Sequence, residues 1–129
     1  MAKPVVLDTS VMIEHERCVS SATEYVSDLL VRGGAALHPV SRAELLCGAR
    51  NRAHLVSIKR MMSPFAVLAI KNVDFADAIE LLESNVLSSR VGWPDCLIAS
   101  TCRRLGATLV TLNERDFRIC PGLKVVRPY

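Results

Sequence analysis

The feature that most constrains the fold is a short apolar run at residues 5–7 that stops abruptly at a carboxylate, Asp8. Three such residues suit a buried strand, and the hydroxyl residues that follow, Thr9 and Ser10, suit the start of a helix. One explanation of Asp8 is therefore a helix cap. The alternative is that the strand delivers this acid to the edge of a sheet, where it takes part in chemistry.

Short apolar stretches alternate with amphipathic ones along the whole chain. Strands are predicted over residues 4–7, 35–38, 66–70, 108–111 and 123–126. Helices are predicted over residues 20–32, 41–49, 51–62, 72–89 and 93–105. This alternation indicates an α/β fold, a three-layer α/β/α sandwich with a mainly parallel sheet of four to five strands. No repeat, linker or low-complexity segment interrupts it, so we predict that residues 1–129 form a single domain.

Composition agrees with this class of fold. Half of the 129 residues are hydrophobic and 22% are charged, which predicts a folded chain with a buried core. The five cysteines include no CxxC pair, and we interpret them as reduced, mostly buried thiols. No segment approaches the ~20 apolar residues of a membrane span. We therefore predict a soluble, cytoplasmic protein with no membrane partner.

The longest predicted helix has two faces. Its apolar stripe, which we predict to lie in the core, consists of Phe75, Ile79, Leu82 and Val86. The opposite, polar face consists of Asp74, Asp77, Glu80 and Glu83. A second apolar group belongs either to the core or to a patch for a partner, and it consists of Tyr25, Met61, Met62 and Phe65.

Four carboxylates stand near predicted helix starts, and each has a simple structural explanation. Asp8 would cap the helix after the first strand, and Glu44 stands at the capping-box spacing from Ser41. Asp95 follows a proline and would favour a helix N-terminus through the dipole. Asp116 stands three residues after an asparagine and would act in a turn. Taken singly, each acid is better explained as a cap.

The joint placement of the four acids favours a different interpretation. Asp8, Glu44 and Asp116 follow predicted strands, and Asp95 begins a helix that runs antiparallel to the next strand. All four would then share the carboxyl edge of the sheet, where such folds bind ligands. Carboxylates at one place repel unless a cation lies between them, and oxygen ligands suit Mg²⁺ or Mn²⁺. Such a site supports phosphodiester hydrolysis by an activated water.

Other chemistries lack their motifs in this sequence. There is no GxxxxGK[ST] or GxGxxG phosphate loop. The position two after Asp8 is Ser10, whereas phosphoryl-aspartate enzymes of the haloacid dehalogenase type usually have a second Asp there. The histidines His15, His38 and His54 have no ligand spacing with any cysteine, and we interpret them as surface or supporting residues. A Ser or Cys nucleophile with a His base stays open, although nothing marks one.

Four segments together resemble the PIN domain family. They are Val6–Leu7–Asp8–Thr9–Ser10, Ser41–Arg42–Ala43–Glu44–Leu45 with Gly48, Asp95–Cys96–Leu97–Ile98–Ala99, and Leu109–Val110–Thr111–Leu112–Asn113 with Asp116–Phe117. In its length, its motif order and its ending at residues 121–123, the chain is similar to the VapC toxins of prokaryotic toxin–antitoxin systems. The resemblance covers nearly the whole chain.

The resemblance implies a Mg²⁺- or Mn²⁺-dependent endoribonuclease that cleaves structured RNA, such as tRNA or rRNA, and so inhibits translation. It also implies a homodimer, or a hetero-oligomer with a cognate VapB-type antitoxin that inserts a segment into the active-site groove. Asp8 and Asp95 match the principal metal ligands of the family. Glu44 and Asp116 match the two other acids.

The resemblance also implies supporting residues around this site. Ser10 and Thr111 correspond to hydroxyls that hold acids or waters in place. Many relatives have Asp where this chain has Asn113, so the fourth ligand position depends on Asp116, and Asn113 would coordinate only through its carbonyl.

Basic residues surround the predicted acidic site, and Arg is well suited to phosphate. The candidates for RNA binding are Arg42, Arg50 and Arg115, whereas Arg52, Lys59 and Arg60 are equally well explained as ordinary surface residues. Arg103 and Arg104 are more simply explained as dipole partners at a helix C-terminus. Two alternatives to a ribonuclease remain: a PIN-like module that binds RNA or protein without cleavage, and a nuclease that acts on DNA.

Overall fold

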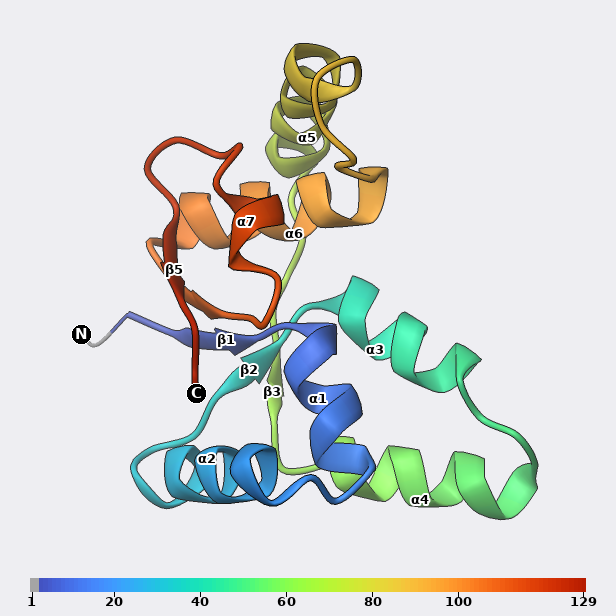
Figure 1. Cartoon of the computed structure of the whole chain (residues 1–129). Coiled ribbons are helices and arrows are strands. Elements are labelled where there is room, and N and C mark those ends of the chain that lie inside the picture. Colours follow the sequence, from blue (N-terminus) through green and yellow to red (C-terminus); the bar gives the residue numbers. More distant parts are fainter. Residues whose placement is uncertain (1–2) are drawn as a thin grey trace.

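The computed structural model describes residues 3–129, and within them five short strands form one sheet (Figure 1). The strands are β1 (Val5–Leu7), β2 (Ala36–Leu37), β3 (Ala66–Val67), β4 (Thr108–Val110) and β5 (Lys124–Val126). Their order is β3-β2-β1-β4-β5, and every neighbouring pair is parallel. The predicted parallel sheet of up to five strands is confirmed, although β3 is shorter than the predicted strand at residues 66–70.

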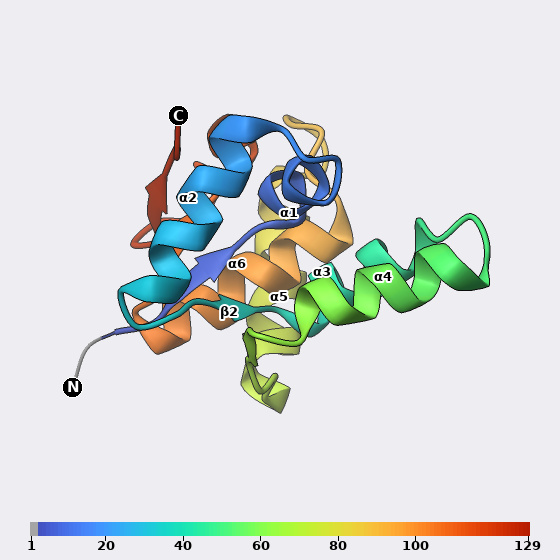
Figure 2. The ribbon, with the colours of Figure 1, turned by 90° about the horizontal axis from the view of Figure 1, so that it is seen from below.

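Helices connect the strands and cover both faces of the sheet. They are α1 (Thr9–Glu16), α2 (Ser20–Val31), α3 (Pro39–Cys47), α4 (Arg52–Met62), α5 (Asn72–Asn85), α6 (Trp93–Leu105) and α7 (Glu114–Phe117). Figure 1 shows α5 and α6 on one side of the strands and α1, α2 and α4 on the other. The predicted three-layer sandwich is therefore confirmed. Figure 2, seen from below, shows that α3 and α4 extend together to one side of the sheet.

Successive strand residues pack into different layers of the core. Val6 and Leu109 belong to a buried cluster with α5 and α6. Leu7 and Val110 belong to a second buried cluster with α1, α2, α3 and α4. Since successive side chains of a strand point to opposite faces, a central strand covered on both faces must be apolar at every position. This requirement explains the uninterrupted apolar run before Asp8.

The strand order reverses direction beside β1. The chain adds β2 and β3 on one side of β1 and then β4 and β5 on the other. The backbone N–H of Asp8 donates to the carbonyl of Val110, 2.9 Å away, at the end of this central pair of strands. In open α/β sheets, the crevice at such a reversal, outside the carboxyl ends of the strands, is where ligands bind.

The predicted core stripe of α5 is wrong at three of its four positions. Phe75, Ile79 and Val86 are 42%, 48% and 53% exposed, and only Leu82 packs partly against the core. The buried face instead contains Ala78 and Leu81, together with Asp74, which we predicted on the polar face.

An ion pair explains why Asp74 lies in the core. Arg104 donates from Nε to Asp74 Oδ1 at 2.7 Å and from Nη2 to Oδ2 at 3.0 Å, and the N–H of Lys71 donates to Oδ2. Burial alone would raise the pKa of Asp74, but these donors outweigh it and hold the pKa below its ordinary value. Arg104 lies in the last turn of α6 as predicted, but it is also the ion-pair partner of Asp74, which the sequence analysis missed. Arg103 instead donates to the carbonyl of Pro121.

The other apolar group belongs to the core, which was one of its two predicted places. Met62 and Phe65 are buried, and Tyr25 and Met61 pack partly buried against the same cluster. The thiols are all free, with Cys96, Cys102 and Cys120 buried and Cys18 and Cys47 exposed. Among residues 3–129, no helix combines the length and the apolar character needed to cross a bilayer.

Candidate active site

Asp8 stands at the N-cap position of α1, but its side chain does not cap the helix. Oδ2 of Asp8 instead accepts hydrogen bonds from Ser10 Oγ at 2.9 Å and from Thr111 Oγ1 at 2.8 Å. The residue is 4% exposed, so both bonds lie in a largely buried place. The simple explanation of Asp8 as a cap is therefore wrong, and both hydroxyls that the family resemblance singled out lie against this acid.

Backbone groups orient the two hydroxyls. The N–H of Leu112 donates to Ser10 Oγ at 3.1 Å, and the N–H of Asn113 donates to Thr111 Oγ1 at 2.9 Å. Because a carboxylate oxygen is an acceptor, each hydroxyl directs its own hydrogen at Oδ2 of Asp8 while it accepts the backbone N–H. Oδ1 of Asp8 receives no hydrogen bond from residues 3–129. One carboxylate oxygen is thus anchored, and the other remains available to a ligand.

Glu44 is positioned differently from our prediction. Helix α3 begins at Pro39, and its cap is His38, whose Nδ1 accepts the N–H of Val40 at 3.0 Å. A proline in the first turn after a side-chain acceptor is a strong start signal, so the predicted start at Ser41 and its capping box with Glu44 are wrong. Oε1 of Glu44 accepts from Thr9 Oγ1 at 2.9 Å, which ties the exposed carboxylate to the residue after Asp8.

His38 also differs from our interpretation of the histidines. The ring is fully buried, and Nε2 lies 3.0 Å from Thr101 Oγ1. Burial lowers the pKa of His38 to about 4, so the ring is neutral at neutral pH. Both ring nitrogens are occupied by protein groups, which makes His38 a structural link between α3 and α6.

Asp95 lies in the first turn of α6, three residues after the cap position Gly92, and is partly buried. Burial, followed by the charges of Asp8, Glu44 and Asp116, raises the pKa of Asp95 to about 6. Like charges raise a carboxyl pKa only when they are close, so Asp8, Glu44 and Asp116 each lie near Asp95.

Asp116 and Asn113 lie at the exposed side of this group. Asn113 precedes α7, but its side chain makes no cap bond, and the N–H of Asp116 donates only to the carbonyl of Asn113. Within the described part of the chain, the Asp116 carboxylate accepts no hydrogen bond. Its explanation as a turn-forming side chain, parallel to the capping box, is therefore not supported.

The donor set fits a hard divalent cation. As the side chains stand, no three Asp, Glu, His or Cys side chains in residues 3–129 converge closely enough to enclose an ion. Mg²⁺ does not require such a cage, since it usually keeps several waters and binds one or two carboxylates together with substrate phosphate. Asp8, with one anchored oxygen, and Asp95, whose charge is unfavourable without a cation, are suited to that mode.

The three arginines predicted to bind RNA come from three different segments. Arg42 is on α3, Arg50 precedes α4, and Arg115 is on α7, and all three are exposed. None of them forms an ion pair with a carboxylate of the described residues. Their guanidinium groups are thus available to an anionic ligand.

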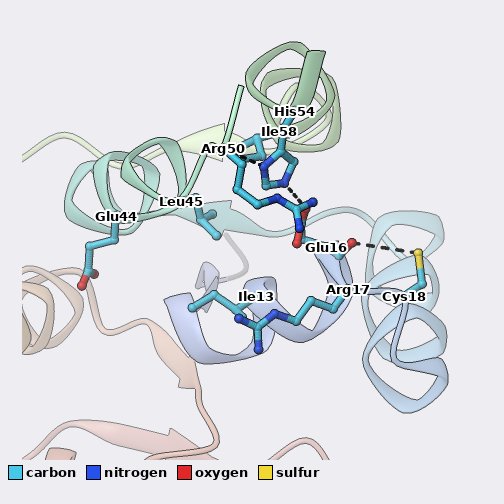
Figure 3. A pocket seen from close by; sticks show the side chains of 10 residues that line it. Ile13, Glu16, Arg17, Cys18, Glu44, Leu45, Arg50, His54 and Ile58 are labelled. Carbon is cyan, nitrogen blue, oxygen red and sulfur yellow. Dashed lines mark hydrogen bonds and ion pairs between the residues drawn. The ribbon is translucent and has the colours of Figure 1, made fainter. Parts of the chain in front are cut away.

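A cavity of about 430 Å³ extends from Glu44 between α1, α3 and α4 (Figure 3). Its walls include Ile13 of α1, Arg17 at the C-terminal cap of α1, and His54 of α4. Sequence reasoning missed this cavity, and it also missed Thr9 as the partner of Glu44. The hydrogen bonds of Thr9 with Glu44 and of His54 with Glu16 join segments about 35 to 40 residues apart. No spacing of motifs in the sequence predicts such bonds.

Comparisons with known proteins agree with this fold. The family model of the PIN domain matches residues 5–121. Ribonuclease VapC10 of Mycobacterium tuberculosis is 31% identical over 121 residues, which cover 93% of this chain and 90% of that protein.

Solved structures are similar over almost the entire chain. The DNA-bound VapBC of Salmonella typhimurium has a TM-score of 0.83 at 21% identity, covering 99% of this chain and 100% of the other. VapBC2 of Rickettsia felis, bound to a DNA fragment from its promoter, has a TM-score of 0.81 at 22% identity. The similarity covers 95% of this chain and 96% of the other. At these identities the similarity shows a shared fold.

Proposed function

Because this chain belongs to the PIN domain family, with a VapC ribonuclease among its relatives, we propose that it is a metal-dependent endoribonuclease toxin. The observation that carries the proposal is the gathering of four acids, in which Asp8, Glu44 and Asp116 help to raise the pKa of Asp95. A bare cluster of like charges is unfavourable, and a divalent cation relieves it. We propose Mg²⁺ or Mn²⁺ as that cation.

The acids have separate roles in this proposal. Asp8 and Asp95 are the principal metal ligands, and Glu44 and Asp116 complete the acidic group. Ser10 and Thr111 fix the orientation of Asp8, since each hydroxyl directs its hydrogen at Oδ2. A bound divalent ion would supply Lewis-acid chemistry, which activates water and stabilises developing charge on a phosphate.

The substrate that we propose is structured RNA, such as tRNA or rRNA, whose cleavage would inhibit translation. Arg42, Arg50 and Arg115 are exposed without acidic partners in the described residues, so they are available to bind backbone phosphates on either side of the acids. Asn113 contributes its backbone N–H to the support of Thr111, and we assign its side chain no metal contact.

The partner that we propose is a VapB-type antitoxin that blocks this site. The similar structures from Salmonella typhimurium and Rickettsia felis are VapBC complexes with bound DNA. Neutralisation of this chain by a cognate antitoxin follows from that relationship. The protein would then be stored in the cytoplasm as a toxin–antitoxin hetero-oligomer.

We also propose that the toxin forms a homodimer through the exposed face of α5. Phe75, Ile79 and Val86 lie along this face, and Trp93 stacks with Phe75 at a ring-centroid distance of 6.4 Å. Contiguous large apolar side chains on a surface typically mark a protein interface.

The direct test is cleavage of total RNA by the purified protein, with Mg²⁺, with Mn²⁺ and with EDTA. Wild type is expected to cleave discrete RNAs only with a divalent ion, and Asp8→Asn is expected to lose at least about 100-fold in rate, since it removes a charged metal ligand. Equal cleavage by Asp8→Asn would overturn the proposal.

Two further arms separate the alternatives. A single-stranded DNA of the same sequence tests the DNA nuclease, because preferential cleavage of that DNA would replace RNA as the substrate. Calorimetric titration with Mg²⁺ tests the non-catalytic module. A silent titration at millimolar Mg²⁺, combined with intact RNA affinity, would show a binding protein instead of an enzyme.

A further inference from the structure

The cavity beside Glu44 has two unlike parts. Its floor is apolar and consists of Ile13, Leu45 and Ile58, of which Leu45 and Ile58 are almost fully buried. Its rim is charged and includes Arg17 and Arg50. Figure 3 shows Ile13 and Arg17 on one side of the space and the α3 and α4 side chains on the other.

The cavity reaches one of the proposed catalytic acids. Glu44 lies at its edge and is also hydrogen-bonded to Thr9, the residue after Asp8. Ile13 stands one helical turn beyond Thr9, which corresponds to about 6 Å along the α1 axis. A group bound in the cavity would therefore lie beside Glu44, at the edge of the proposed acidic site.

The charges on the rim favour an anionic ligand. Within residues 3–129, neither Arg17 nor Arg50 pairs with a carboxylate, although both are exposed beside the cavity. Glu16, the other acid of the lining, is already bonded to Nε2 of His54. Nδ1 of His54 accepts the backbone N–H of Arg50 at 3.1 Å, so Nε2 carries the hydrogen that Glu16 accepts. The same ring holds the backbone of Arg50 in place.

We propose that this cavity is a nucleotide subsite of the nuclease. It binds one unpaired nucleotide of the RNA next to the cleaved phosphate, with the base against the apolar floor and the adjoining phosphates on Arg17 and Arg50. The cavity volume is in the range of small-ligand pockets. A base that has left its stack is held between aromatic or apolar side chains, and Arg provides a planar fork for phosphate. The inference rests on the proposed function, because the acids must hold the cleaved phosphate.

A protein segment is the competing occupant, and the charges argue against it as the sole ligand. An apolar segment would use the floor but leave two guanidinium groups unmatched at the rim. A nucleotide matches both parts, since it joins an apolar base face to a phosphate on each side. The subsite therefore predicts that the cleaved RNA is unpaired at this position.

Binding without cleavage tests the subsite separately from the catalytic proposal. A fluorescein-labelled ten-nucleotide single-stranded RNA is titrated in EDTA, and anisotropy is measured at several NaCl concentrations. Arg17→Gln and Arg50→Gln are each expected to weaken binding about three- to tenfold and to reduce the slope of log K against log salt by about 0.7. Arg32→Gln is the matched control, because Arg32 is exposed but pairs with Asp28 far from the cavity, and its slope should be unchanged.

An abasic scan tests the base contact. Each position of the RNA is replaced in turn by an abasic nucleotide, and one position is expected to weaken wild-type binding about 5- to 100-fold. Ile13→Ser, at a partly exposed floor position, should bind the intact RNA more weakly and lose most of this abasic effect. A cavity that does not hold the base would leave the abasic effect the same in both proteins.

The outcomes separate cleanly. The subsite is overturned, even if the protein cleaves RNA, by either of two results. One is a slope of log K against log salt in Arg17→Gln and Arg50→Gln that equals the wild-type slope. The other is an abasic scan in which no position weakens binding. Loss of antitoxin binding in those variants with unchanged RNA affinity also overturns it and assigns the cavity to the protein partner. RNA bound as proposed, but never cleaved with Mg²⁺ or Mn²⁺, supports the subsite and overturns the catalytic proposal.

Discussion

The hydroxyl of Thr111 donates a 2.8 Å hydrogen bond to Oδ2 of Asp8, although 103 positions separate the two residues in the chain. Asp8 follows β1 and Thr111 follows β4, and these strands are neighbours at the place where the sheet order reverses. The bond therefore links the two walls of the crevice in which an α/β sheet binds its ligand. It also orients the acid that we propose as the central metal ligand.

Removing the hydroxyl of Thr111 tests whether it positions Asp8 for cleavage in addition to stabilising the fold. Thr111→Val keeps the shape of the side chain but removes the donor to Asp8 and leaves the N–H of Asn113 without its acceptor. We expect a loss of about 10- to 100-fold in RNA cleavage, as for other supporting residues of metal ligands, and about 1–3 kcal/mol in stability.

Thr111→Ser is the matched control, because it keeps the hydroxyl. Its cleavage rate should stay within a few-fold of wild type, and its Mg²⁺ titration should be close to the wild-type curve. If Thr111→Val cleaves as fast as Thr111→Ser, the hydrogen bond does not serve the reaction.

The raised pKa of Asp95 predicts a pH-dependent cost in the metal-free protein. The folded pKa of about 6 exceeds the ordinary value of about 3.9, so between pH 4 and 6 the native state binds more protons than the unfolded state. The contribution of this group to stability is therefore fully present below about pH 4 and is lost as the pH rises through 6. Asp95→Asn should be more stable than wild type at pH 7.5 in EDTA, and the difference should shrink toward pH 4.

Urea melts at pH 4, 5, 6 and 7.5 measure this difference. His38, whose pKa is lowered to about 4 by burial, has the opposite trend, but it is present in both proteins and cancels. Mg²⁺ should stabilise wild type at pH 7.5 more than Asp95→Asn. A difference that stays constant across these pH values would contradict the prediction.

Breaking the buried ion pair of Asp74 and Arg104 should destabilise the α5–α6 layer. Arg104→Met leaves a fully buried carboxylate without its guanidinium, and we expect a loss on the order of 3 kcal/mol in unfolding free energy. Arg103→Met, next in the chain, removes only a hydrogen bond to a backbone carbonyl and should cost less than about 1.5 kcal/mol.

The double variant Asp74→Asn with Arg104→Met checks the cause. Since it removes the unpaired charge, it should recover part of the stability that Arg104→Met loses. Chemical denaturation of the four proteins gives the coupling energy. Simple additivity of the two single changes would show that the pair contributes nothing specific.

If the exposed face of α5 is the homodimer interface, a charge on that face should lower the molar mass of the protein in solution. Ile79→Glu introduces a charge at the centre of the proposed homodimer interface, and the protein should change from a dimer to a monomer in light scattering after size exclusion. Val56→Glu on α4 is the matched control, since Val56 is 46% exposed and Ile79 is 48% exposed. An unchanged dimer in Ile79→Glu would rule out this face as the interface.

Local patterns in the sequence were sufficient for the class of fold. Apolar runs of strand length, amphipathic helices and stop signals such as Gly106 each follow from the few residues around them, and the parallel sandwich follows from their alternation. Asp8 and Asp95 were recognisable for the same reason, because Asp8 directly follows β1 and Asp95 lies in the first turn of α6.

Side-chain partners distant in the chain were beyond such patterns. Asp74 was assigned to the polar face of its helix because carboxylates usually face water, whereas the charge that compensates its burial comes from Arg104, 30 residues later. The start of α3 was misplaced because histidine is not among the usual caps, although His38 accepts the bond that a serine would.

The sequence by itself therefore determined the layers and the strands, since these depend on hydrophobic period, and its local chemistry identified four candidate acids. Only the tertiary structure decided that β1 and β4 lie side by side, that Ser10 and Thr111 anchor one oxygen of Asp8, and that a cavity opens beside Glu44. These features require contacts between segments separated by tens of residues, and their free energy depends on burial and hydrogen-bond geometry that no local pattern encodes.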